Sequence, residues 1–335
     1  MIAALLIGLV PVILFLVGLV FMDSYKLVTA RSLWFAIGAG VVAAASCFLI
    51  NRFLLDRLHV PVTFIALNLA PILEESAKAL YVAWLIRAHR VGFMVDAGIQ
   101  GFAVGTGFAL VENLYYANAL GSVGLFVWLV RGLGTAVMHG STTALVAIAS
   151  KDLVDRHPPG RWIHFLPSLA LAIVVHGVFN RFSSNPLFAT AFLLLGMPLL
   201  LFAVFERSER TTRQWLGTGL DLDMELLEQI LSGEVGETRV GRYLHSLKQR
   251  FPGEVVADML CMLQIHVELS ARAKGLMIAR AAGIDLPMDE HVRANLDELR
   301  FLEKSIGPTG RMAVVPCLRT SSRDLWHLYM LEMKH

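Results

Sequence analysis

Charged residues are scarce in this sequence. Asp, Glu, Lys and Arg make up only 17% of its 335 residues, whereas hydrophobic residues make up 56% and the mean hydropathy is +0.62. Soluble globular domains carry about 25% charged residues. The composition therefore excludes an ordinary soluble enzyme and indicates a chain that crosses a membrane several times.

Cysteine and clustered basic residues are also rare. The three cysteines, Cys47, Cys261 and Cys317, form neither a CxxC pair nor a Cys/His ligand spacing, so we expect them to be packing residues. The net charge is +2 and no basic stripe is visible. This pattern excludes nucleic acid as a partner.

The sequence lacks three motifs of intramembrane proteolysis. It contains no HExxH, no GxSx serine motif, and no GxGD, because Gly105-Thr106-Gly107 is not followed by aspartate. Ser141 lies two residues from His139 on the same predicted helix and would point away from it. These absences exclude three established protease chemistries.

The charges that are present are unevenly distributed. Residues 1–206 hold nine of the 27 acidic residues and twelve of the 29 basic residues, which leaves eighteen and seventeen for the shorter stretch 207–335. The sequence therefore predicts two domains, a transmembrane domain over 1–206 and a soluble helical domain over 207–335.

The transmembrane domain is predicted to be an all-α bundle of about seven helices, at about 20 apolar residues for each crossing. The first helix is expected to be retained, because it lacks the basic start and small-residue cleavage site of a signal peptide. The predicted helices cover 2–22, 33–50, 60–86, 93–117, 123–149, 163–181 and 186–205.

Basic residues favour the connections on one side of these helices. Ten lie on that side, against Arg52, Arg57 and Arg181 on the other. The positive-inside rule then places the N-terminus outside and the soluble domain in the cytosol, an arrangement that fits a bacterial inner membrane. The ten residues are Lys26, Arg31, Arg87, Arg90, Lys151, Arg156, Arg161, Arg207, Arg210 and Arg213.

The soluble domain shows apolar residues at helical spacing. Gly283 is predicted to end a helix. Gly307-Pro308 is predicted to interrupt the helical structure before a short last helix, Leu325 to Met333. The other predicted helices of this domain cover 222–231, 240–250, 254–281 and 289–305.

Three ionisable residues interrupt the third apolar stretch. Glu74 and Glu75 lie near mid-bilayer, and Lys78 lies one turn closer to the cytosol. A charge at that depth costs from about 3 to above 10 kcal/mol, depending on the scale. Lys78 can offset one carboxylate and leave the other available. Adjacent residues point about 100° apart on a helix, so the spacing does not decide which glutamate performs chemistry.

The next three predicted helices add polar groups at similar depth. Glu112 lies in the fourth, His139 in the fifth, and His176 with Asn180 on one face of the sixth. Three glycines precede Glu112 at a spacing that permits close helix contact. We expect these polar groups to converge. The glycines are Gly101, Gly105 and Gly107.

Each polar residue also has a structural explanation. A single buried histidine such as His139 is more often a hydrogen-bonded core residue than a ligand, Lys78 can simply neutralise a neighbour, and Asn113 and Asn180 can join helices by hydrogen bonds. Together, however, the carboxylates and two histidines supply what a metal-bound or carboxylate-activated water requires. We therefore interpret the set as an active site.

These ordered motifs resemble the PrsW family of intramembrane proteases, which is related to the CAAX prenyl proteases. The CAAX relatives carry a histidine where Glu112 stands. The resemblance covers about 60–180 and implies hydrolysis of peptide bonds in membrane-anchored proteins, with anti-sigma-factor-like substrates in regulated proteolysis. The matching motifs are Glu74-Glu75-x-x-Lys78, Phe108-x-x-x-Glu112-Asn113, His139 and His176-x-x-x-Asn180.

The expected mechanism uses a glutamate as general base. Glu74 or Glu75 would activate a water that attacks the scissile carbonyl, His139 and His176 would hold that water or a Zn²⁺, and Asn180 would donate to the developing oxyanion.

Whether zinc takes part is left open, because a metal-free mechanism with glutamate-activated water also fits these residues. Glu112 would either complete the zinc site or orient a histidine. The expected ligands are Glu75, Glu112, His139 and His176, and the supporting residues are Lys78, Phe108 and Asn113.

Two other functions fit the same residues. The buried carboxylates and histidines would also suit the relay of a proton- or cation-coupled transporter, although no inverted repeat is visible. Alternatively, the membrane domain is a sensor whose cytosolic domain binds a regulatory partner.

Overall fold

The computed structural model describes residues 2–119, 128, 133–157, 161–181, 186–284, 286, 290–318, 326 and 330–331. Within these ranges the chain forms helices and no strand, which confirms the all-α prediction. The chain divides into two compact units, Met1–Glu209 and Arg210–His335. The division lies close to the expected boundary at 206/207.

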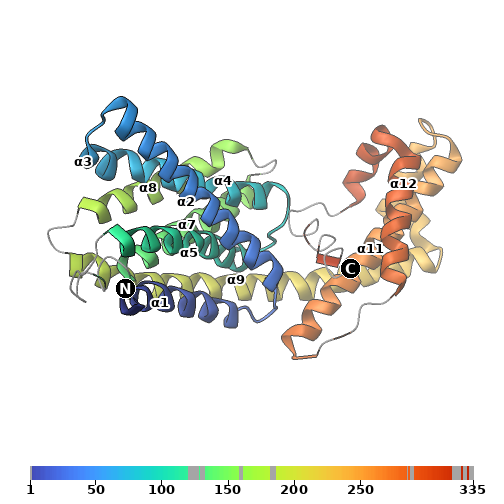
Figure 1. The fold of residues 1–335 in the computed structure, drawn as a ribbon. Helices are drawn as coiled ribbons and strands as arrows, with labels where there is room; N and C mark the ends of the chain where they lie inside the picture. The colour runs from blue at the N-terminus through green and yellow to red at the C-terminus, as the bar shows by residue number, and fades with distance from the viewer. Residues whose placement is uncertain are drawn as a thin grey trace. The chain divides into compact units, whose positions relative to one another are not determined.

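The first unit is a helical bundle in which α5 is central (Figure 1). α5 packs against α7, α2 and α1, and α4 packs against α2, α7 and α8. The elements are α1 Ile2–Phe21, α2 Ala30–Leu58, α3 Val62–Phe64, the π-helical turn η1 Ile65–Leu69, α4 Ala70–Arg87, α5 Met94–Ala119, α7 Thr135–Arg156, the 3-10 turn η3 Trp162–Phe165, α8 Leu166–Arg181 and α9 Pro186–Leu231.

Three helical segments among the described residues are long and apolar enough to cross a membrane: Ala30–Leu58, Met94–Ala117 and Trp162–Arg181. α4 carries Glu74, Glu75 and Lys78 in its middle, so its sequence is less apolar. The structure thus supports an integral membrane protein, and the number of seven spans stays a prediction.

Two helices continue beyond their predicted ends, and each extension contains an ion pair at i,i+4 spacing. α2 passes residue 50 through Arg52 and Asp56, whose Nε and Oδ2 atoms lie 3.2 Å apart. α7 passes residue 149 through Lys151 and Asp155, whose Nζ and Oδ1 atoms lie 2.6 Å apart. Pairs at this spacing add to the stability of a helix. The predicted start of the fifth helix, at 123, lies outside the described residues.

The predicted third helix, 60–86, is interrupted by the π turn η1. Ala70 donates its N–H to the carbonyl of Ile65, five residues earlier. Pro71 has no N–H to donate to Leu67, so the regular ladder cannot continue unchanged through this segment. The π turn therefore changes the direction in which the residues of α4 face relative to those before it.

The seventh predicted helix does not end at 205, because α9 runs without a break from Pro186 to Leu231. Glu206 and Arg210, like Glu209 and Arg213, have the i,i+4 spacing that supports an exposed helix. No proline follows Pro198 within α9. The polar composition of this stretch predicted a domain boundary, yet it is compatible with a helix.

The second unit continues with η5 and α10 to α12. As predicted, Gly283 follows the end of α11 with φ 76°, and Gly307 breaks α12 with φ 68°. Most of the predicted last helix, Leu325 to Met333, lies outside the described residues. The bounds are η5 Glu234–Glu237, α10 Arg239–Leu247, α11 Gly253–Ala281, α12 Glu290–Val314 and η6 Val315–Cys317.

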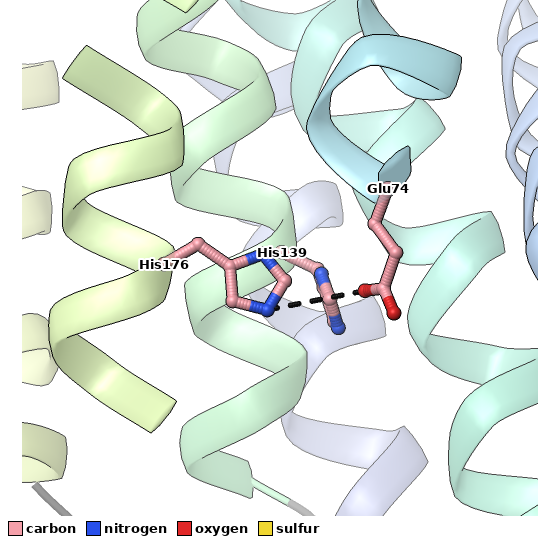
Figure 2. A group of neighbouring side chains, drawn as sticks. All are labelled: Glu74, His139 and His176. Atoms are coloured by element: carbon pink, nitrogen blue, oxygen red, sulfur yellow. Dashed lines mark ion pairs between the residues drawn. The ribbon is translucent and has the colours of Figure 1, made fainter. Parts of the chain in front are cut away.

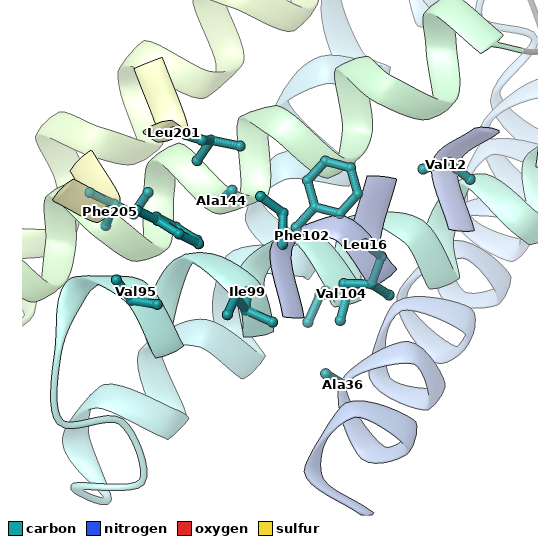
Figure 3. Packing of buried hydrophobic residues seen from close by; sticks show 14 of the residues in the cluster. Val12, Leu16, Ala36, Val95, Ile99, Phe102, Val104, Ala144, Leu201 and Phe205 are labelled. Carbon is teal, nitrogen blue, oxygen red and sulfur yellow. The ribbon is translucent and has the colours of Figure 1, made fainter. Parts of the chain in front are cut away.

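A buried apolar cluster surrounds α5 in the first unit (Figure 3). Ile99 and Phe102 of α5 are fully buried and lie among side chains from α1, α2, α7 and α9. Phe15 of α1 packs on Phe102 with ring centroids 4.9 Å apart. The cluster holds α5 in the middle of the bundle, and α5 in turn carries Glu112.

Glycines let the neighbouring helices approach α5 closely, as their spacing predicted. A Cβ atom at Gly105 would lie 2.2 Å from the carbonyl oxygen of His139, and one at Gly101 would lie 2.6 Å from that of Thr143. Gly107 faces α2, where its Cβ would lie 2.0 Å from the carbonyl oxygen of Ile37. These contacts bring α5 and α7 together at the level of His139.

Gly105→Ala is therefore expected to destabilise the protein by about 1–3 kcal/mol, because the added methyl group meets backbone atoms that cannot move aside. Gly38→Ala is the matched control: its Cβ meets nothing within 4 Å, and alanine is the better helix former. Thermal unfolding in detergent measures both. Equal melting temperatures for the two variants would contradict this account of the α5–α7 contact.

Candidate active site

Four helices of the first unit contribute ionisable side chains to one buried group. Glu74, Glu75 and Lys78 come from α4, and Glu112 comes from α5. The histidines come from α7 and α8, and Figure 2 shows both beside Glu74. The structure therefore brings together residues that lie up to about a hundred positions apart in the sequence.

Glu75 is the most buried carboxylate of this group. Its side chain has no exposed area, and its Oε1 atom accepts hydrogen bonds from Lys78 Nζ at 2.7 Å and from His176 Nδ1 at 2.7 Å. The ammonium offsets the negative charge, which would otherwise be very costly at this position. Glu75 thus joins α4 to α8.

The contact with Glu75 also determines which ring nitrogen of His176 carries the proton. A carboxylate only accepts hydrogen bonds, so the proton of a neutral imidazole lies on Nδ1 and the lone pair on Nε2. His176 Nε2 faces Glu74, with Oε2 of that residue 3.9 Å away (Figure 2). A carboxylate that orients an imidazole in this way is common behind metal-binding and catalytic histidines.

His139 is held at both ring nitrogens. Its Nδ1 lies 3.0 Å from Lys78 Nζ, and its Nε2 lies 2.6 Å from Glu112 Oε2. Because an ammonium has no acceptor, the Lys78 contact requires an unprotonated Nδ1, and Nε2 then donates to Glu112. Phe108 packs on the same imidazole with ring centroids 4.7 Å apart. Lys78 therefore links Glu75 to His139 and determines how both are oriented.

Glu74 differs from Glu75 in exposure. The Glu74 side chain is 12% exposed and that of Glu112 is 23% exposed, whereas Glu75 and Lys78 are fully enclosed. Glu74 is thus the less enclosed carboxylate of the adjacent pair. The structure distinguishes two neighbours that helical spacing alone left equivalent.

Both asparagines of the predicted motifs hydrogen bond to backbone carbonyls. Asn113 Nδ2 donates to Gly8 of α1 at 3.1 Å, and Asn180 Nδ2 donates to Ala66 in the π turn at 3.0 Å. These bonds are the interhelical contacts that the structural explanation anticipated. A role for Asn180 at the oxyanion stays a prediction, and it would use the second N–H of the amide, because the first donates to Ala66.

Asn68 was not among the predicted residues. Its Oδ1 atom accepts from Arg181 NH2 at 2.6 Å, so the end of α8 contacts the π turn at a second point. π turns are frequent at functional sites, and this one immediately precedes the glutamates. An amide inside an otherwise apolar run was the sequence signal that could have indicated this contact.

The donor set fits zinc. Glu74, His139 and His176 each offer a ligand atom, and these atoms all lie within 4.8 Å of one another. Ligands about 2.0–2.1 Å from a tetrahedral zinc are about 3.4 Å apart, close to the 3.9 Å between His176 Nε2 and Glu74 Oε2. This trio contains Glu74, which the expected ligand set lacked, while Glu75 and Glu112 contact the histidines.

A buried polar atom also supports a bound water or ion near this group. Glu75 Oε2 is enclosed and has no hydrogen-bond partner among the described residues, although its Oε1 atom has two. Buried carboxylate oxygens without a protein partner usually contact a water or a cation.

The fold and the site together define a helical membrane protein with a buried carboxylate–imidazole centre suited to activating water. The model of the PrsW family, described as intramembrane metalloproteases, matches residues 29–205, which is more than half of the chain. The chain therefore belongs to the PrsW family and is an intramembrane peptidase. Comparison with curated proteins and with solved structures finds no match.

Lys78→Met is expected to destabilise the protein by about 3–5 kcal/mol, because it leaves the Glu75 carboxylate buried without a counter-charge. Adding Glu75→Gln should recover part of that loss. Arg52→Gln serves as control: it breaks an exposed pair worth about 1 kcal/mol or less. Thermal unfolding in detergent gives all four stabilities. The buried pair would not have the role described if Lys78→Met were as mild as Arg52→Gln.

Proposed function

We propose that this protein cleaves membrane-anchored protein substrates with Glu74 as the general base. The observation that carries this proposal is the different environment of the two adjacent glutamates. Glu75 is enclosed and neutralised by Lys78, whereas Glu74 is partly exposed and faces the lone pair of His176 Nε2. A base must be reachable by the water it deprotonates.

In the proposed reaction, Glu74 takes a proton from a water that it holds together with His176 Nε2. The hydroxide oxygen forms a bond to the scissile carbonyl carbon, and the carbonyl oxygen becomes an oxyanion. Glu74 then gives its proton to the amide nitrogen as the C–N bond breaks. The products are a carboxylic acid and an amine, and Glu74 returns to its starting state.

The remaining residues hold this geometry in place. Glu75 keeps the proton of His176 on Nδ1, and Lys78 with Glu112 fixes the ring of His139. If zinc is bound, Glu74, His139 and His176 would hold it, and Glu74 would then be a ligand rather than the free base. His139 would ligate through a nitrogen that now contacts Glu112 or Lys78. Zinc would supply Lewis-acid activation of the water and the carbonyl.

The depth of the site supports membrane-anchored substrates. Glu74 lies about 20 Å along α4 from Arg87, at about 1.5 Å per residue, in a hydrocarbon core about 30 Å thick. A substrate helix that reaches this depth must unwind locally, because its carbonyls are otherwise hydrogen bonded within the helix. We propose lateral entry of such a segment and anti-sigma-factor-like proteins as substrates.

The distribution of basic residues supports an orientation with the N-terminus outside and the second unit in the cytosol of a bacterial cell. We propose that this second unit, Arg210–His335, is a cytosolic domain that binds a regulatory partner. Deleting residues 215–335 should then leave peptide cleavage intact and abolish the cellular response to it.

Glu74→Gln is expected to lower cleavage of a membrane-anchored peptide by about 10²–10⁴-fold with little change in melting temperature, because it removes the base and leaves the buried pair of Glu75 with Lys78 intact. Glu75→Gln should lower activity and stability together, since Lys78 loses its counter-charge. Cleavage in liposomes and thermal unfolding separate the two effects.

Asp56→Asn is the control for those variants, because Asp56 is an exposed carboxylate of the same unit and lies in the last turn of α2. It should cleave like the parent protein. Cleavage at the parental rate by the Glu74→Gln protein would rule out Glu74 as the base.

Metal content tests the zinc version separately. Elemental analysis of the purified protein should show about one zinc per chain, and His176→Ala should lower that value because it removes a ligand. A chelator should then abolish cleavage, and zinc should restore it. A metal-free protein that cleaves normally in chelator would instead support water activation by glutamate alone.

A further inference from the structure

Two arginines and two tryptophans form a compact surface at one end of the first unit, which we call the Trp–Arg surface. Trp84 and Arg87 lie in the last turn of α4, Arg90 follows in the connection to α5, and Trp162 begins η3. α4 ends where η3 and α8 begin, and α4 packs against α8. Segments far apart in the sequence therefore meet here.

Each arginine lies on the face of one of these indoles. The guanidinium carbon of Arg87 is 4.5 Å from the ring centroid of Trp162, and that of Arg90 is 5.4 Å from the ring centroid of Trp84. Both distances are within the range of cation–π attraction. The rings thus restrict the two guanidiniums before any ligand binds, which lowers the entropic cost of binding.

The Trp–Arg surface faces outward. Trp84 is 47% exposed and Trp162 is 59% exposed, and both arginines are exposed as well. Exposed tryptophans in a membrane protein concentrate at the level of the lipid headgroups, where the ring is apolar and the N–H is hydrated. Guanidinium groups bind phosphate oxygens with two parallel hydrogen bonds. An apolar ring beside a phosphate-binding group matches the boundary between acyl chain and headgroup.

At the opposite end of the bundle, the contacts of Arg52 and Arg181 within the described residues are with acceptors of the protein and include no indole ring. Arg52 pairs with Asp56 at 3.2 Å, and Arg181 donates to Asn68 and to the carbonyl of Gly177.

We propose that the Trp–Arg surface binds the headgroup of an anionic phospholipid. The phosphate contacts Arg87 and Arg90, and the glycerol and upper acyl chain lie along Trp84 and Trp162. Arg87 ends the helix that carries Glu74, so the bound lipid sets the depth of that helix in the bilayer. This inference concerns lipid binding and does not depend on the proposed proteolytic mechanism.

Binding of phosphatidylglycerol to the purified full-length protein tests the proposal. Native mass spectrometry in detergent would follow lipid adducts during a titration, with phosphatidylcholine as the zwitterionic comparison. The double variant Arg87→Gln/Arg90→Gln should need about 30-fold more phosphatidylglycerol, from about 1 kcal/mol for each basic side chain near an anionic surface.

Arg52→Gln/Arg57→Gln is the matched control, because it removes two exposed positive charges at the other end of the same unit. It should bind within about twofold of the parent protein. Trp162→Leu keeps every charge but removes the ring beneath Arg87, and it should weaken binding several-fold. This single variant carries the test if the double variant does not fold.

Three results would overturn the proposal. The first is parental affinity in a folded Arg87→Gln/Arg90→Gln protein, or in Trp162→Leu where that variant carries the test. The second is an equal loss in Arg52→Gln/Arg57→Gln, which would indicate only an effect of net charge. The third is binding of phosphatidylcholine as tight as that of phosphatidylglycerol. Inorganic phosphate should compete poorly, because it cannot contact the two indoles as a lipid does.

Discussion

The buried carboxylate of Glu75 is the constraint on which the first unit depends. Water does not solvate a charge inside the bundle, so the protein itself must do so. Lys78 and His176 both donate to the same oxygen of Glu75, and Lys78 also contacts His139. These few hydrogen bonds connect α4, α7 and α8. The contacts that offset the cost of burying the Glu75 charge therefore also orient the two imidazoles.

Lys78 neutralises one of the two adjacent glutamates, and the other is the one that we propose as the base. Glu74 lies on the same helix, is more exposed than Glu75, and faces His176 Nε2. A membrane protein that hydrolyses peptide bonds needs an anionic base and water at a depth where both are unfavourable. In the proposed mechanism, Lys78 pairs with the enclosed charge while the partly exposed Glu74 faces an imidazole, so two adjacent residues would meet both requirements.

Backbone geometry supplies the precision that this arrangement needs. The missing Cβ atoms of Gly101 and Gly105 let α7 approach α5 closely enough for His139 to reach Glu112. The π turn before α4 changes the direction in which the glutamate side chains point. Asn180 of α8 donates a hydrogen bond to that turn. Small residues and the π turn before α4 thus position side chains that a regular helix would direct elsewhere.

Much of this could be predicted from the sequence, because helix formation and side-chain chemistry are local properties. Apolar runs indicated the helices, and the glutamates and histidines in consecutive helices indicated a site. Local pattern did not reveal the π turn at η1, the continuity of α9, or the contact between Asn68 and Arg181. It also left Glu74 and Glu75 equivalent. Those features depend on which helices contact one another. Such contacts join residues far apart in the sequence, so only the tertiary structure determines them.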